Sequence, residues 1–169
     1  STFWCVLEFA RAAGADEAVK TDTDLDVATP LSGTRVLVVD DSALNRELAE
    51  LLLTAAGATV TLAEDGRAAL AWLTAHPKAA DIVLMDVQMP HLDGYAATRL
   101  IRRDPRWREL PIVALTAGAF QSMREAAQSA GMNDFIAKPF EVEQLIACIR
   151  RWTGAHVPSE PETMPGAAP

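Results

Sequence analysis

The sequence has 169 residues, of which 50% are apolar and 22% charged, and its net charge is −8. This balance is typical of a soluble globular chain with one ordinary domain. The apolar runs are far shorter than the roughly 20 residues of a membrane-spanning helix, and no stretch has the pattern of a signal peptide. The acidic charge argues against nucleic acid or an anionic membrane as a direct partner. We therefore expect a cytoplasmic protein, and its start at Ser1 predicts a fragment of a longer chain.

Composition divides the chain into a central region and two flanks. Residues 11–33 are rich in Ala, Asp, Thr and Gly, which predicts a solvated linker. Residues 154–169 contain four prolines in sixteen positions without periodicity, which predicts a disordered tail. Residues 34–153 are the expected folded domain. Cys5 and Cys148 lie far apart without metal-ligand spacing, so we expect two buried, reduced thiols.

Residues 34–153 alternate strand and helix patterns five times. In chain order we expect a strand at 35–39, a helix at 43–56, a strand at 58–62, a helix at 66–75, a strand at 81–85, a helix at roughly 94–102, a strand at 111–115, a helix at 121–130, a strand at 134–137 and a helix at 141–152. In the first helix, apolar residues at 44, 48, 51, 52 and 55 form the predicted buried stripe, and Gly57 ends it.

The strand patterns also predict the fold class. Strands that are apolar on both faces and alternate with helices indicate a parallel sheet covered on both sides. Five such units in about 120 residues predict an α/β fold, a doubly wound (βα)5 domain. In this class the ligand lies beyond the carboxyl ends of the strands.

The predicted strand ends carry polar residues that complement one another. Asp40 and Asp41 follow the first strand, Asp86 follows the third, Thr116 the fourth and Lys138 the fifth. Because all these ends open onto one crevice, three carboxylates, a hydroxyl and an ammonium should meet there. Three close carboxylates repel one another, and a hard divalent cation such as Mg²⁺ relieves the repulsion. The sequence therefore predicts a magnesium site.

This combination also suits phosphoryl transfer. The metal and the lysine would neutralise the phosphoryl oxygens, and the Asp86 carboxylate would attack in line to give an aspartyl phosphate. A backbone carbonyl in the loop after Asp86, that of Gln88, would complete the protein ligands of the metal.

Each of these residues also has an ordinary structural interpretation. Asp40 and Asp41 could cap the following helix, Thr116 could simply end a strand, and Lys138 with Pro139 could form a turn. The coincidence of complementary groups at four separate strand ends favours a functional site.

Four segments of the sequence resemble the receiver domain of two-component signalling proteins. They are VLVVDDSALNREL (36–48), DIVLMDVQMPHLDGY (81–95), PIVALTA (111–117) and DFIAKPF (134–140). The resemblance covers the whole of residues 34–153. It implies a flavodoxin-like receiver fold with a five-stranded parallel sheet in the order 2-1-3-4-5.

The resemblance implies roles for the acidic residues. Asp86 would be the phosphoacceptor. Asp41 would bind Mg²⁺ directly, Asp40 would bind it mainly through water, and the backbone carbonyl of Gln88 would be the third protein ligand.

It also implies a conformational switch. Thr116 would bond one phosphoryl oxygen and Lys138 would pair with another. Phe135 would be the aromatic residue that rotates inward when Thr116 is drawn towards the phosphoryl group, and the Lys138–Pro139 peptide bond should be cis.

The first nine residues, STFWCVLEF, are similar to the end of the ATP-binding domain of sensor histidine kinases. This implies that residues 1–10 are the remnant of the last strand of that domain and that the chain is the C-terminal receiver of a hybrid kinase, whose parent could be membrane-anchored. An ordinary N-terminal strand with an unknown partner is the alternative. The implied partners are a phosphohistidine on the kinase dimerisation domain and a histidine phosphotransfer domain. Without a kinase core the fragment would only assist its own phosphorylation and dephosphorylation, as a monomer or weak homodimer.

Three other functions compete with this interpretation. A phosphatase of the haloacid-dehalogenase type needs a second acid two residues after its nucleophile, where this chain has Gln88. A flavodoxin-like FMN module needs a phosphate-cradling loop after the first strand, where Asp40 and Asp41 would repel the phosphate. A pseudo-receiver would act only as a protein-binding scaffold, although the site residues are all present.

Overall fold

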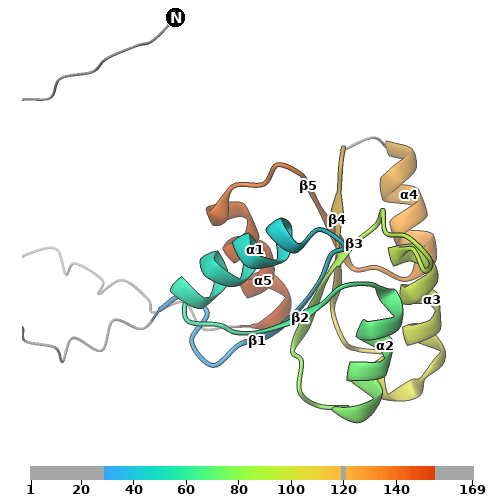
Figure 1. Ribbon diagram of the computed structural model, residues 1–169, viewed down its shortest axis with the longest axis horizontal. Coiled ribbons are helices and arrows are strands. Elements are labelled where there is room, and N and C mark those ends of the chain that lie inside the picture. The colour runs from blue at the N-terminus through green and yellow to red at the C-terminus, as the bar shows by residue number, and fades with distance from the viewer. Residues whose placement is uncertain (1–28, 119–120, 155–169) are drawn as a thin grey trace, which may run out of the picture.

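The computed structural model describes residues 29–118 and 121–154 (Figure 1). The predictions for residues 1–10, for residues 11–28 of the linker and for residues 155–169 of the tail lie outside the described residues. The same holds for Cys5. Cys148 is buried and forms no disulfide.

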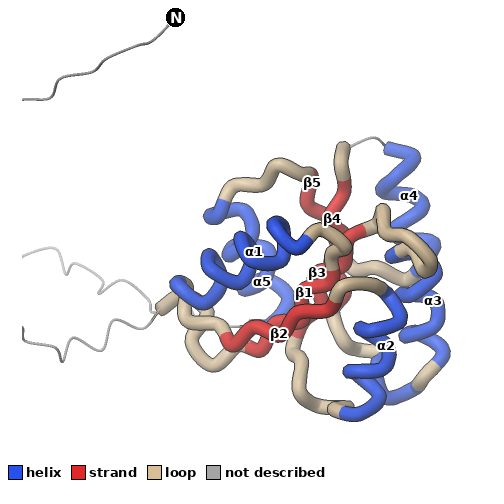
Figure 2. The backbone as a smooth tube through the Cα atoms, in the orientation of Figure 1, coloured by secondary structure: helices blue, strands red, loops and turns tan. Residues whose placement is uncertain are grey.

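A parallel five-stranded sheet forms the middle layer of the domain, in the order β2-β1-β3-β4-β5 (Figure 2). Its strands are β1 (Arg35–Val39), β2 (Thr59–Ala63), β3 (Ile82–Asp86), β4 (Ile112–Thr116) and β5 (Asp134–Ala137). The side chains of β3 and β4 are buried along their whole length, which explains their uninterrupted apolar runs. The predicted strand order and the doubly wound fold are confirmed.

Two helical layers cover the sheet. The helices are α1 (Ala43–Ala55), α2 (Gly66–Ala75), α3 (Gly94–Arg103), α4 (Gln121–Ala130) and α5 (Val142–Thr153), with a short 3₁₀ helix η1 (Pro105–Trp107). Figure 1 shows α1 and α5 on one face and α2, α3 and α4 on the other. Each face has its own apolar core, one built with Leu53 and Ile149 and the other with Leu73 and Ile101.

Three strands begin and end one residue later than predicted, namely β2, β3 and β4. The prediction ended each strand with its apolar run, but backbone pairing continues further. Asp86 pairs with Leu115, and Thr116 pairs with Ala137. These two polar residues therefore belong to the sheet itself, which holds their backbones more firmly than a loop would.

The predicted buried stripe of the first helix is wrong. Leu44, Leu48 and Leu51 are 73%, 48% and 67% exposed, whereas α1 buries Ala49 and Leu53. The predicted leucine stripe and the buried stripe of Ala49 and Leu53 lie on neighbouring faces of the same helix. The face with the small Ala49 packs against the sheet, and the larger leucines remain on the surface.

Candidate functional site

The carboxyl ends of four strands bring the predicted site residues to one edge of the sheet. Asp40 and Asp41 directly follow β1, Asp86 ends β3, Thr116 ends β4 and Lys138 directly follows β5. Because all the strands are parallel, these ends lie at the same edge.

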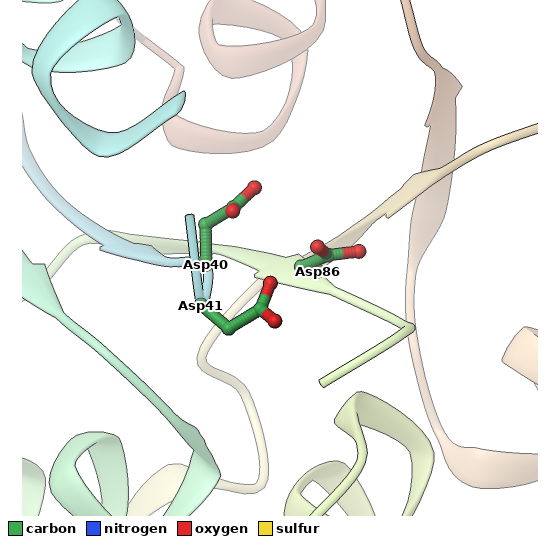
Figure 3. Close-up of side chains that lie close together, drawn as sticks. All are labelled: Asp40, Asp41 and Asp86. Atoms are coloured by element: carbon green, nitrogen blue, oxygen red, sulfur yellow. The ribbon is translucent and has the colours of Figure 1, made fainter. Parts of the chain in front are cut away.

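The three carboxylates form a compact cluster. Asp40, Asp41 and Asp86 each offer an oxygen within 4.8 Å of the others, and Figure 3 shows the three side chains gathered at the ends of β1 and β3. Asp40 and Asp86 are buried, whereas Asp41 is exposed. Carboxylate oxygens at this spacing are the ligands that Mg²⁺ prefers, so the donor set fits that ion.

Lys138 bridges two of these carboxylates. Its Nζ lies 2.6 Å from Oδ2 of Asp40 and 2.8 Å from Oδ2 of Asp86. Burial lowers the pKa of Lys138, but the hydrogen bonds to Asp40 and Asp86 outweigh it, and the pKa is raised overall. The side chain is therefore a firmly protonated ammonium at the centre of the site.

Asp86 has a raised pKa, and burial is the largest cause. The hydrogen bond from Lys138 and the backbone N–H of Gln88, which donates to Oδ1 at 3.1 Å, act in the opposite direction. The nearby charge of Asp40 adds to the rise in pKa. A further cation beside Asp86 would favour its ionised form.

A polar network fixes the segment that carries Asp40. The backbone N–H of Ser42 and the side-chain amide of Asn45 both donate to Asp40 Oδ1, at 2.9 and 3.1 Å. Arg46 Nη1 donates to the backbone carbonyls of Asp40 and Asp41. Ser42 is the residue that caps α1, so the acidic pair remains available for the site. Sequence reasoning missed Asn45 and Arg46, although both stand in the quoted segment 36–48.

Thr116 is buried, and its hydroxyl points into its own loop. Its Oγ1 donates to the carbonyl of Gly118 at 2.5 Å. The backbone of Lys138 is tied to the same residue, because its N–H donates to the Thr116 carbonyl at 2.6 Å. The Lys138–Pro139 peptide bond is cis.

Phe135 lies apart from the carboxylate cluster, on β5 beneath α4. Its ring is half-buried and packs against the core beside α2, α3 and α4. The guanidinium carbon of Arg124 lies 4.2 Å from the ring centroid. The sequence contained no signal for this contact.

Gly94 allows the loop after β3 to fold back onto the site. A Cβ at this position would overlap the backbone carbonyl of Asp86. The preceding Asp93 caps α3 by accepting a hydrogen bond from the Ala96 N–H at 2.7 Å. The Asp93–Gly94 pair therefore serves turn and capping chemistry beside the cluster.

This fold, with its acidic cluster and lysine at one edge of the sheet, is that of a two-component signalling domain. Residues 36–150 match the response regulator receiver domain family. The chain belongs to this family, in which phosphorylation and Mg²⁺ are typical. This match favours the receiver interpretation over the phosphatase and flavin-binding alternatives.

The chain is similar to segments of much longer sensor kinases. It is 42% identical over 134 residues to the sensor protein GacS of Pseudomonas syringae pv. syringae, covering 76% of this chain and 15% of that protein. It is 34% identical over 176 residues to the probable histidine kinase 5 of rice (Oryza sativa subsp. japonica), covering 92% of this chain and 15% of that protein. The chain thus spans about 15% of the length of these relatives. The segments matched in these relatives are receiver domains of hybrid sensor histidine kinases.

Solved structures share the fold. The receiver domain of a sensor histidine kinase from Pseudomonas aeruginosa, with a magnesium ion coordinated in its active-site cleft, is 43% identical with a TM-score of 0.65, over 73% of this chain and 99% of that chain. The chemotaxis protein CheY4 of Vibrio cholerae is 30% identical with a TM-score of 0.66, over 70% of this chain and 97% of that chain. Among the described residues of this chain, no helix is both long enough and apolar enough to cross a membrane.

Proposed function

We propose that this domain accepts a phosphoryl group from a phosphohistidine onto Asp86. The observation that carries the proposal is the position of Lys138, whose ammonium bridges Asp40 and Asp86 inside a cluster of three carboxylates. A fixed cation beside a buried carboxylate is what a transferring phosphoryl group requires.

Asp40, Asp41, Asp86 and the backbone carbonyl of Gln88 would hold Mg²⁺, which when bound supplies positive charge for the phosphoryl oxygens. Asp40 already accepts hydrogen bonds from Ser42, Asn45 and Lys138. Asp41 is exposed, so its carboxylate is more accessible to a metal ion. This difference supports direct binding by Asp41 and water-mediated binding by Asp40.

The transfer itself uses the residues of this chain. An oxygen of Asp86 attacks the phosphorus, and the bond between phosphorus and the donor imidazole nitrogen breaks. The bonding electron pair remains on that nitrogen, which then takes a proton from water. Lys138 pairs with one phosphoryl oxygen, and the Thr116 hydroxyl turns away from Gly118 to donate to another.

The same movement would operate the switch. When Thr116 turns towards the phosphoryl group, the Phe135 ring moves inward, and the surface formed by α4, β5 and α5 changes. In this view phosphorylation shifts a population between two conformations, because the phosphoryl group binds one of them better.

We further propose that the domain comes from a hybrid histidine kinase and lies in the cytoplasm. The match with the rice kinase supports this origin, since it covers 92% of the chain and so extends beyond residues 36–150. The donor would be a phosphohistidine on the kinase dimerisation domain, and a histidine phosphotransfer domain would be the next partner.

The exposed leucines of α1 support a protein donor. Leu48 lies on the exposed face of α1 and also lines an apolar pocket with Lys138, Pro139 and Phe140, so the leucine face continues to the acceptor site. A donor that delivers phosphohistidine to Asp86 would cover this face. We expect Leu44→Ser with Leu48→Ser to slow transfer from the phosphorylated kinase region of the GacS relative but not from phosphoramidate. Unchanged transfer from the protein donor would contradict docking on α1.

Acceptor chemistry is tested by incubating the protein with Mg²⁺ and phosphoramidate and reading its intact mass. The wild type should gain one phosphoryl group, and Asp86→Asn or the omission of Mg²⁺ should abolish the gain. Asp93→Asn is the matched control, because Asn also caps a helix and the substitution removes a carboxylate from the same loop. If the wild type gains no mass, the pseudo-receiver interpretation replaces this proposal.

A further inference from the structure

We propose that Arg124 is a positioning residue for the switch: its guanidinium holds the Phe135 ring in its present place and thereby opposes phosphorylation-dependent switching. This rests on the proposed switch role of Phe135. The guanidinium carbon lies 4.2 Å from the ring centroid, well within the range of about 6 Å for a cation–π interaction.

The surroundings of the ring make this contact important. Phe135 and Arg124 both line a cavity of about 300 Å³ between α4 and β5, together with Ala127 and Met132. On the cavity side the ring has fewer van der Waals partners than a fully packed side chain. Arg124 therefore provides a large part of what restrains the ring on that side.

A second contact fixes the adjoining backbone of α4. The hydroxyl of Tyr95, on α3, donates to the carbonyl of Met123 at 3.3 Å. Arg124 is the next residue, so its backbone is anchored to α3 while its side chain covers a ring on β5. Because this bond holds the backbone beside Arg124, the guanidinium reaches the ring from an anchored point, and inward movement of the ring lengthens the contact.

The size of the effect follows from the kind of interaction. Arg124 is exposed, and a cation–π contact at an exposed site contributes about a two- to fivefold factor to an equilibrium. If the contact exists only while the ring lies beneath Arg124, switching must break it. A ligand that favours the switched conformation then binds more weakly by the same factor.

The test measures the affinity of the domain for beryllofluoride, a phosphoryl mimic, in the presence of Mg²⁺ by isothermal titration calorimetry. We expect Arg124→Ala to bind about two- to fivefold more tightly than the wild type, with Arg124→Lys in between. Arg99→Ala removes an equal charge from an exposed position on α3 and controls for simple electrostatics. General damage to the fold would weaken binding, which is the opposite sign.

A double-mutant cycle with Phe135→Leu completes the test. Once the aromatic ring is absent, Arg124→Ala should change the affinity no further. Equal affinity of Arg124→Ala and wild type, or the same gain in the Phe135→Leu background, would overturn the role of Arg124 while normal labelling by phosphoramidate left the proposed function intact. A wild type that neither binds beryllofluoride nor gains a phosphoryl group would overturn both.

Discussion

Lys138 and Asp40 are 98 positions apart in the sequence, yet their side chains form an ion pair of 2.6 Å. Asp40 follows β1 and Lys138 follows β5, and β3 and β4 lie between these strands in the sheet. The ammonium thus reaches across the edge of the sheet, and its second partner, Asp86, belongs to one of the strands in between. The Asp86 carboxylate is therefore held within a contact that spans four of the five strands.

Replacing Lys138 should separate phosphoryl transfer from metal binding. Lys138→Ala removes the fixed cation beside Asp86, and we expect the rate of labelling by phosphoramidate to fall roughly 10²-fold or more, as for other groups that stabilise transition-state charge. Mg²⁺ should bind at least as well, because the carboxylates lose a competing cation. Time-resolved intact mass and Mg²⁺ titration measure the two effects. Lys78→Ala, which removes an exposed lysine, is the control, and an equal labelling rate in both variants would contradict the role of Lys138.

The two faces of α1 should differ in their contribution to stability. Leu53 is fully buried, and Leu53→Ala should lower the free energy of unfolding by about 2–5 kcal/mol. Leu51 is 67% exposed, and Leu51→Ala should change it by no more than about 0.5 kcal/mol. Urea unfolding followed by circular dichroism measures both. Similar losses of unfolding free energy in the two variants would show that the leucine stripe predicted from the sequence is buried after all.

The ion pair between Asp81 and Arg35 should give the domain an acid-sensitive component of stability. The hydrogen bond from Arg35 lowers the pKa of Asp81 below its ordinary value of 3.8. Because the folded pKa is the lower one, this stabilisation is present above the unfolded pKa and is lost as the pH falls through the folded pKa. The urea midpoint should therefore fall less between about pH 5 and about pH 2 in Asp81→Asn than in the wild type. Glu64→Gln, at an exposed carboxyl after β2, should leave the wild-type slope; a wild-type slope in Asp81→Asn would show that the pair contributes nothing.

Cys148 should be chemically inert in the folded domain. Burial, aided by the charge of Asp134, raises the pKa of its thiol to about 12. At about pH 8 almost no thiolate is present, and the side chain is also inaccessible. In a Cys5→Ser background, iodoacetamide should label Cys148 slowly in buffer and rapidly in urea. Rapid labelling of the folded protein would mean that α5 opens readily.

The features that the sequence predicted correctly depend on local apolar patterns, which can be recognised without knowledge of the tertiary structure. Apolar runs such as that before Asp86 predict buried parallel strands, and parallel strands bring their ends together. The choice of the buried face of α1 failed because two candidate faces exist, and only the packing of Ala49 against the sheet decides between them. The contact of Arg124 with Phe135 joins α4 to β5. It depends on how α4 packs against the sheet, which no local sequence pattern specifies.

The position of a strand in the sheet determines how firmly its backbone is held. Asp86 lies on β3, which has hydrogen-bonded neighbours on both sides, whereas Phe135 lies on β5, which within residues 29–118 and 121–154 pairs only with β4. A displacement of β5 and α4 therefore strains a single backbone ladder and leaves the ladders on both sides of Asp86 in place. Backbone amides of β3 should accordingly exchange with solvent far more slowly than those of β5. In the proposed switch, the outer edge of the sheet would change while Asp86 keeps its place.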